Sequence, residues 1–292
     1  MNYKMVGFVL GRIFLIEAAL MLFPMGCAAI YGEWSVVLSF LWPTLIVRVL
    51  GLITSLRTPQ NTKIYARDGL AIVALVWVLM SVFGALPFVI SGEIPSFADA
   101  FFETVSGFTT TGSTILTDVE ALSHGTLFWR SFSHWIGGMG VLVFAMAVLP
   151  MTDGRAMHLM RAEVPGPTCG KISSKLSDSA KILYAIYLVM TVIETILLCA
   201  GGMPLFDALI HAFGTAGTGG FSNKALSVGA YNSPYFEIVI GVFMLLFGIN
   251  FNLYYFLLLR HFRAAFAHEE MRVHLGFVAF STLKTTATIA GL

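Results

Sequence analysis

The sequence predicts an all-α integral membrane protein in which a two-helix hairpin is followed by two repeats of one unit: a helix, a short segment and a second helix. Three observations predict this fold: an apolar composition, apolar segments of membrane-spanning length, and a duplicated motif between them. Of the 292 residues, 57% are hydrophobic and only 11% are charged, whereas soluble domains contain about 25% charged residues. The net charge of +1 gives no indication of a nucleic-acid partner; the lipid bilayer is the expected surrounding.

The apolar segments have the length that a helix needs to cross a bilayer, about 20 residues. They cover approximately residues 6–30, 35–56, 69–91, 126–150, 181–202 and 234–260. The first is too long for a cleaved signal peptide, and no small-residue cleavage site separates it from the second. We therefore expect six transmembrane helices, of which the first two form an N-terminal hairpin over residues 1–56.

The distribution of Lys and Arg predicts the orientation of these helices. The linkers after the second, fourth and sixth segments carry eleven of the seventeen basic residues. The two linkers on the opposite side, residues 92–125 and 203–233, carry only Lys224, and the first of them holds five acidic residues. Because basic linkers stay in the cytoplasm, we expect a multi-pass protein of the cell (inner) membrane with both termini cytoplasmic. The latter two linkers, here called the outer linkers, face outwards.

The two outer linkers contain the same motif. "FADAFFETVSGFTTTGST" (97–114) and "LFDALIHAFGTAGTGGFS" (205–222) align without a gap. Four identities mark this alignment, here called the repeat register: Asp99 with Asp207, Ala100 with Ala208, Thr110 with Thr218, and Gly112 with Gly220. The alignment predicts one repeat over 69–150 and another over 181–260, followed by a cytoplasmic segment and the start of a truncated third repeat over 261–292.

Each copy of the motif begins with about ten apolar residues and then becomes rich in Gly and Thr. Ten helical residues rise about 15 Å, half of the hydrocarbon core, so the chain must turn back without crossing. Non-helical backbone at this depth is tolerated only where it is buried in protein or lines a water-filled path. Free carbonyls can replace the water around a cation, and glycine permits the positive φ that aims them. An ordinary loop is the alternative, but two copies in register favour an ion-lining pore loop.

Several motifs in the same order resemble the TrkH family, membrane subunits of bacterial potassium uptake systems in the Trk/Ktr/HKT superfamily. They are "SGFTTTGST" (106–114), "FWRSFSHWIGGMG" (128–140), "RAEVPGP" (161–167) and "AFGTAGTGGFS" (212–222). The resemblance implies a pore of four helix–pore loop–helix repeats, each with one filter strand, and K⁺ as the transported ion. The implied filter residues are Thr110, Thr111, Gly112, Thr218, Gly219 and Gly220.

The chain departs from this family in length, because it contains two of the four repeats. We therefore interpret it as the N-terminal portion of a Trk-type subunit. The resemblance implies a homodimer and a cytosolic nucleotide-binding regulatory subunit of the TrkA type. Two alternatives stay open: a half-length pore protein that dimerises to complete a four-strand filter, and a non-conducting regulatory subunit. An enzyme is not expected, because no paired acids or histidine cluster lie near one membrane face.

Charged side chains inside the apolar segments have simpler interpretations. The arginines lie near segment ends, where their long side chains can reach the interface; they are Arg12, Arg48 and Arg130. The deeper acids Glu17 and Glu194 are candidates for interhelical hydrogen bonds, and His211 for a packing residue. "GGMG" (137–140) is expected to pack tightly behind the filter, and Gly125, in an outer linker, to tolerate serine. Cys27, Cys169 and Cys199 suggest neither a disulfide nor a thiolate metal site.

Overall fold

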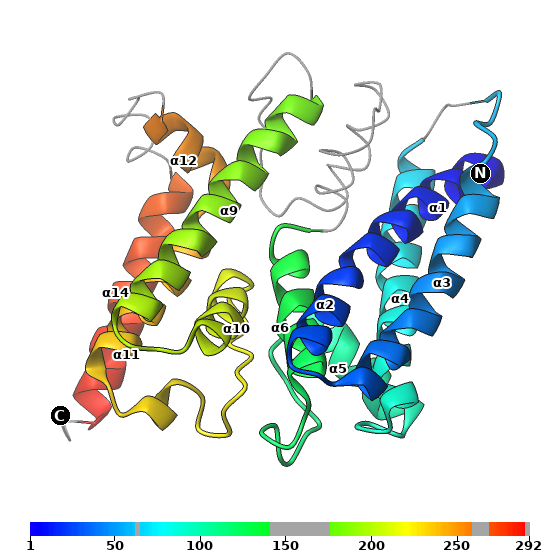
Figure 1. Ribbon diagram of the computed structural model, residues 1–292. Helices are drawn as coiled ribbons and strands as arrows, with labels where there is room; N and C mark the ends of the chain where they lie inside the picture. The colour runs from blue at the N-terminus through cyan, green and yellow to red at the C-terminus, as the bar shows by residue number, and fades with distance from the viewer. Residues whose placement is uncertain (62–64, 141–175, 259–268, 290–292) are drawn as a thin grey trace.

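The computed structural model describes residues 1–61, 65–140, 176–258 and 269–289, and within these ranges every regular element is a helix. The predicted all-α fold is therefore confirmed. Figure 1 shows the elements, which are α1 (Tyr3–Leu20), α2 (Leu22–Ile30), α3 (Trp34–Ser55), α4 (Ala66–Ser91), α5 (Phe97–Phe108), α6 (His124–Gly138), α9 (Leu176–Ala200), α10 (Leu205–Ala216), the 3₁₀ helix η1 (Ser227–Tyr231), α11 (Pro234–Phe247), α12 (Phe251–Leu258) and α14 (Glu269–Ile289).

Four helical segments of the described chain are long and apolar enough to cross a membrane. They are Tyr3–Ile30, Trp34–Ser55, Arg67–Ser91 and Lys181–Ala200. The first comprises α1 and α2, which meet at Met21, and α1 packs against both α3 and α4. The first three and the fifth predicted spans are therefore present as membrane-length helices.

The predicted span over 234–260 is wrong as a single helix. α11 ends at Phe247 after 14 residues, and α12 starts at Phe251. Gly248 and Asn250 lie in the gap, and both residue types have poor helix propensity. Hydropathy could not reveal this break because the break contains few polar residues.

The fourth predicted span, 126–150, breaks at the equivalent place. α6 ends at Gly138, and Gly140 then adopts a φ of 79°. Gly140 aligns with Gly248 in the repeat register. Both repeats thus interrupt the helix after the pore loop at the same point, while residues 141–150 lie outside the described part of the chain.

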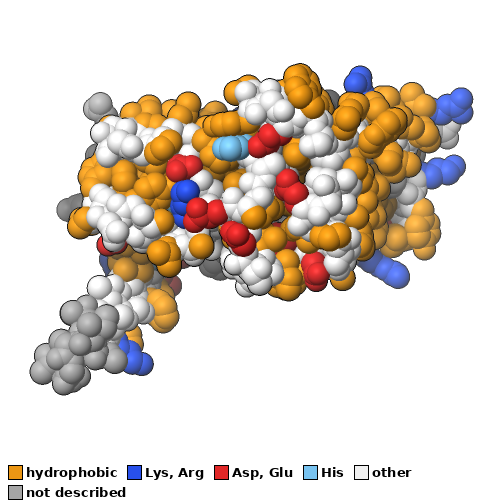
Figure 2. Space-filling view, turned by 60° about the horizontal axis from the view of Figure 1, so that its bottom comes forward, with side chains coloured by type: hydrophobic (Ala, Val, Ile, Leu, Met, Phe, Trp, Pro, Cys, Tyr) orange, Lys and Arg blue, Asp and Glu red, His pale blue; other side chains and the backbone are white. Residues whose placement is uncertain are grey.

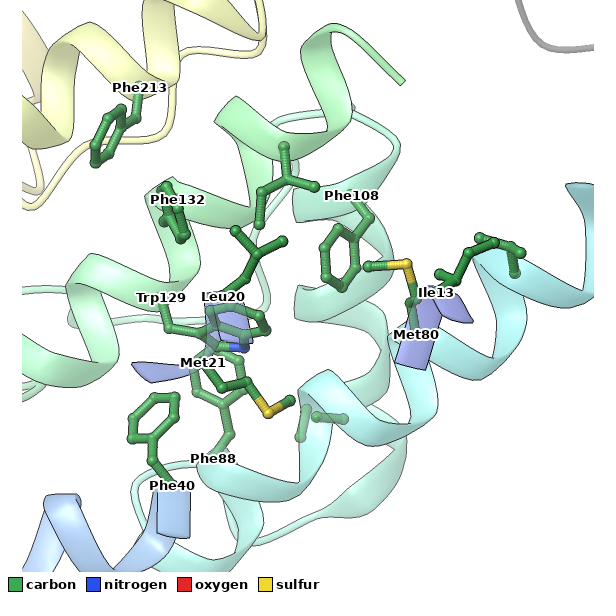
Figure 3. Close-up of a cluster of buried hydrophobic side chains, with 14 of the residues drawn as sticks. Ile13, Leu20, Met21, Phe40, Met80, Phe88, Phe108, Trp129, Phe132 and Phe213 are labelled. Atoms are coloured by element: carbon green, nitrogen blue, oxygen red, sulfur yellow. The ribbon is translucent and has the colours of Figure 1, made fainter. Parts of the chain in front are cut away.

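α6 occupies the centre of the fold, where it packs against α2, α5 and α10. Its Trp129 is fully buried, and the Trp129 ring meets the rings of Phe40 and Phe108 edge to face (Figure 3). The indole N–H donates to the carbonyl of Gly84 in α4 at 2.9 Å. Since lipid gives no hydrophobic driving force between helices, this close ring packing and the hydrogen bond are the contacts through which Trp129 joins α6 to α3, α4 and α5.

The glycines of "GGMG" bring α6 close to the ends of both short helices. A Cβ added to Gly137 would overlap the carbonyl of Phe108, the last residue of α5. A Cβ added to Gly138 would lie 3.0 Å from the carbonyl oxygen of Ala216, the last residue of α10. The expectation of tight packing at this motif is confirmed, and one helix thereby sets the position of two chain reversals.

The N-terminus and the end of α14 lie at opposite ends of the helix bundle. In Figure 1 the N-terminus is at the upper end, whereas α14 runs downwards to the end where the loops after α5 and η1 lie. α14 has 21 residues but is not among the helices apolar enough to cross a membrane. On which side of the membrane each terminus lies stays a prediction.

Candidate functional site: two chain reversals at membrane depth

The short helices α5 and α10 have the same length, 12 residues each, and their ends coincide in the repeat register. At 1.5 Å per residue they rise about 18 Å, less than the hydrocarbon core. Asp99 and Asp207 occupy their first turns. Both helices therefore direct a C-terminal end, which carries the negative pole of the macrodipole, towards the segment that follows.

α5 ends in a Schellman motif, in which two backbone N–H groups beyond the helix bond back to its last carbonyls. The N–H of Thr110 donates to the carbonyl of Gly107 at 3.0 Å, and the N–H of Thr111 donates to that of Ser106 at 2.9 Å. Thr110 has a φ of 55°. A β-branched residue in this left-handed region is uncommon, and backbone strain of this kind gathers at functional sites.

α10 ends in the same way, residue for residue. The N–H of Thr218 donates to the carbonyl of Thr215 at 2.8 Å, and the N–H of Gly219 donates to that of Gly214 at 3.2 Å. Thr218 has a φ of 56°. From the sequence, positive φ was expected only at glycines, so the two left-handed threonines were not predicted. Their identical position in both copies of the motif could have indicated a special backbone geometry.

Two residues after each threonine, a glycine again has positive φ: 76° at Gly112 and 79° at Gly220. Thr111 and Gly219, which lie between, do not have positive φ. In a regular extended strand successive carbonyls point to opposite sides, and a left-handed residue at every second position turns them towards the same side. The two segments therefore have the backbone geometry that a row of carbonyl ligands requires.

The structure brings the two predicted filter triplets, Thr110–Gly112 and Thr218–Gly220, into contact. A Cβ added to Gly112 would overlap the carbonyl of Gly219, and one added to Gly219 would lie 2.7 Å from the carbonyl oxygen of Thr110. The side chains of Thr111 and Thr218 are exposed. The triplets thus form two adjacent strands on one open surface of the described chain.

The first strand is held from behind by the side chains of α5. Ser106 donates its hydroxyl to the carbonyl of Ser113 at 2.6 Å. Glu103 accepts hydrogen bonds from the hydroxyl of Thr114 at 2.9 Å and from the N–H of Ile115 at 3.0 Å. A carboxylate and a hydroxyl of one helix therefore determine where the strand leaves the filter.

The second strand is held by His211, the residue that aligns with Glu103. Its Nδ1–H donates to the carbonyl of Asp207 at 2.7 Å, so Nε2 is free to accept from the hydroxyl of Ser222 at 3.0 Å. Ser222 aligns with Thr114, so both repeats anchor the same position with different chemistry. His211 is 3% exposed and acts as a structural residue, as expected.

Arg130 does not extend to the membrane interface, and the expectation for it is wrong. Its side chain is 3% exposed, and its Nε donates to the carboxylate of Glu103. Its Nη1 donates to the carbonyl of Ser222 at 2.9 Å, and its guanidinium lies 3.6 Å from the centroid of the Phe221 ring. An arginine near the end of an apolar segment can equally turn inwards when a buried acid receives it.

The other charged residues in the apolar segments have different environments. Arg48 is exposed, and Arg12 is partly buried with its guanidinium 5.4 Å from the centroid of the Phe8 ring. Glu17 and Glu194 are fully buried, and their carboxylates make no hydrogen bond within the described residues. Interhelical hydrogen bonds of these two acids stay a prediction; the hydroxyl of Thr215 on α10, which lies near Glu194, donates to the carbonyl of His211 in its own helix.

The N-terminal hairpin caps α6 on its outer end. The carboxylate of Glu33 accepts hydrogen bonds from the N–H groups of His124 at 2.8 Å and Gly125 at 3.0 Å. A Cβ added to Gly125 would lie 2.7 Å from the Cβ of Ala28. Gly125 is thus buried where helices meet, and the expectation that it tolerates serine is wrong.

The face that carries the two outer linkers is acidic around the chain reversals. Figure 2 shows acidic side chains gathered near the middle of this face, with few basic ones among them. Lys224, the single basic residue of the outer linkers, pairs with Glu120 at 3.3 Å. In the described part of the chain no group of three or more His, Cys, Asp or Glu could hold a metal ion.

Two matching chain reversals among helices of membrane-spanning length define a multi-pass membrane protein built on a repeat. The chain belongs to the TrkH family, described as a cation transport protein, which matches residues 35–291. This is a family of transporters, not of enzymes. The recognised family is thereby confirmed.

Individual relatives support the same assignment. The Trk system potassium uptake protein TrkH of Salmonella typhimurium is 40% identical over 221 residues, covering 74% of this chain and 46% of its own length. TrkG of Escherichia coli K12 is 35% identical, covering 89% of this chain and 54% of its own. The crystal structure of the potassium transporter TrkH from Vibrio parahaemolyticus superposes with a TM-score of 0.78 at 29% identity, covering 97% of this chain and 57% of that one. The chain spans about half the length of these relatives.

Proposed function

We propose that this chain supplies two strands of a carbonyl-lined filter through which K⁺ enters the cell. The filter residues are Thr110–Gly112 and Thr218–Gly220. The observation that carries the proposal is the identical termination of α5 and α10, with left-handed Thr and Gly at alternate positions. The names of its relatives, potassium uptake proteins, support K⁺ as the ion.

The chemistry of the proposed step is electrostatic and involves no covalent change. Carbonyls aimed at one axis replace the hydration shell of the ion, and the C-terminal ends of α5 and α10 add negative potential there. The acidic outer face raises the local concentration of cations. An interior-negative membrane potential then favours entry by about 2.3 kcal/mol per charge for each 100 mV.

A cation needs ligands on all sides, and two strands supply half of such a shell. We infer that a working filter has four strands and that the other two come from a further part of a full-length Trk-type subunit. The alternative is a second copy of this chain, because Gly112 and Gly220 are equivalent in the repeat. A homodimer and a regulator of the TrkA type belong to the same proposal.

K⁺ binding tests the proposed filter when all four strands are present, so the purified protein is a full-length Trk-type subunit that contains this sequence. A ligand that binds the folded state raises the melting temperature by mass action, so we expect a higher value in KCl than in NaCl of equal concentration. Equal melting temperatures in the two salts would contradict the proposal.

Growth of a bacterium deficient in potassium uptake distinguishes the two sources of the missing strands. With this chain as its only transporter, we expect no growth on limiting K⁺. Rescue would instead favour a pore completed by a second copy, and cross-linking of Cys variants at Gly112 and Gly220 between chains would then follow.

A further inference from the structure

A buried ion pair lies behind both filter strands. Glu103, on α5, is 1% exposed, and Arg130, on α6, is 3% exposed. Removing charges from water carries a large desolvation penalty, which is offset only when the geometry is good and the remaining hydrogen-bonding groups are satisfied. The pair therefore depends on its further partners, and these are the two strands.

Each member of the pair holds a different strand. Glu103 accepts from the hydroxyl of Thr114 and the N–H of Ile115, just beyond the first triplet. Arg130 donates to the carbonyl of Ser222 and lies over the ring of Phe221, just beyond the second triplet. The ion pair is thus a bridge of side chains from one strand to the other.

Among the described residues, the second repeat has no equivalent of this bridge. In the repeat register, Glu103 corresponds to His211 and Arg130 to Ile238. Ile238 is 65% exposed, so it cannot perform the inward contact that Arg130 makes. The anchoring of Thr114 and of Ser222 is different, because both repeats have it at equivalent positions. The asymmetry therefore separates the bridge from the support that each short helix gives to its own strand.

We propose that Glu103 and Arg130 are positioning residues that set the spacing between the two adjacent filter strands, and with it the preference for K⁺ over Na⁺. The inference rests on the proposed filter function. The planar guanidinium of Arg130 contacts the carboxylate of Glu103 and the carbonyl of Ser222 at once. These two contacts define the spacing between the strands. Loss of either contact lets the strands move relative to each other, and the carbonyl ligands lose their common geometry.

Three variants separate positioning from mere stability. Arg130→Lys keeps the charge beside Glu103 but cannot make both contacts at once. Glu103→Gln leaves a buried guanidinium without its counter-ion, and folding can suffer. The double variant Glu103→Gln/Arg130→Gln removes both charges, so the folded state is retained without an unpaired buried ion.

The variants are made in the same full-length Trk-type subunit, and the measurement is its melting temperature in KCl and in NaCl of equal concentration. A purely structural role lowers both values and leaves their difference unchanged. We expect Arg130→Lys and the double variant to lose most of the K⁺-specific difference, even where the double variant melts near the wild type. Glu237→Gln, which removes an exposed carboxylate of α11, is the control and should keep the full difference.

The outcomes are distinguishable. If the wild type shows no K⁺-specific difference, the proposed filter itself fails and this inference fails with it. If the wild type shows the difference and both Arg130→Lys and the double variant retain it, the filter stands and the positioning role is overturned. Loss of the difference in these two variants but not in Glu237→Gln supports the proposal.

Discussion

The backbone of Gly112 lies directly against the carbonyl of Gly219, so that no side chain fits between the two strands at this point. Gly220, the equivalent of Gly112 in the second repeat, has open space around the position of a Cβ within this chain, and the proposed filter has a further strand that can occupy this space. The two glycines share a positive φ but differ in their surroundings. The same substitution at each of the two glycines therefore tests how the two strands are packed.

We expect Gly112→Ala to destabilise the two-repeat chain more than Gly220→Ala. Both variants place a Cβ in the left-handed region, which costs about 1–2 kcal/mol, but only in the first does the Cβ also push apart two strands of this chain. The melting temperature of the purified two-repeat chain measures the difference. Gly229→Ala, at a site with open space and no positive φ, is the control. Equal effects of the two filter variants would contradict the close approach of the strands.

Replacing Thr218 by glycine tests whether the left-handed threonines are strained. Thr218 is exposed, so its side chain contributes little packing, while glycine adopts a φ of 56° freely. We expect Thr218→Gly to raise the melting temperature, by an amount equivalent to about 1 kcal/mol, and to weaken K⁺-specific stabilisation because the strand is less constrained. A lower melting temperature would show that the threonine is not strained.

The cap that Glu33 forms on α6 predicts a loss of stability in acid. Burial raises the pKa of Glu33, but hydrogen bonds from the N–H groups of Gly125 and His124 outweigh it and hold the pKa below its ordinary value of 4.5. A carboxyl with a lowered folded-state pKa contributes stability at pH values above its unfolded pKa, and this contribution is lost as pH falls through the lowered value. We expect the melting temperature to decrease in that acidic window.

Glu33→Gln is the matched variant for this pH dependence. Its side chain cannot titrate, so its melting temperature should be lower than that of the wild type near neutral pH and should converge with it in acid. Parallel pH profiles for the two proteins would exclude Glu33 as the titrating group.

Single cysteines test the predicted orientation of the linkers. In a background without Cys27, Cys169 and Cys199, Glu120→Cys should react with a membrane-impermeant thiol reagent added to intact cells, since the outer linkers face outwards. Asp178→Cys, at the start of α9, should react only after the cells are opened. Labelling of the latter in intact cells would reverse the assigned orientation.

The register of the two motifs made the position of the chain reversals predictable. Thr110 and Thr218, like Gly112 and Gly220, occupy equal places in two local patterns, and a pattern of short helix followed by Gly and Thr has few solutions inside a membrane. Hydropathy likewise revealed α3 and α4, because the need for about 20 apolar residues is a local property of the chain.

Tertiary structure decided the roles of individual side chains. From the sequence, the side chain of Arg130 could extend to the membrane interface or turn inwards. The position of Glu103 on the neighbouring α5 selects the inward orientation. From the sequence Gly125 was assigned to a loop, whereas in the structure α2 packs against it. The break after α11 could not be predicted from hydropathy. The sequence by itself determined the all-α membrane fold and the location of the carbonyl strands, because these follow from the local composition of the apolar segments and from the duplicated motif. Which groups brace those strands depends on contacts between residues far apart in the chain, whose free energies no local pattern encodes.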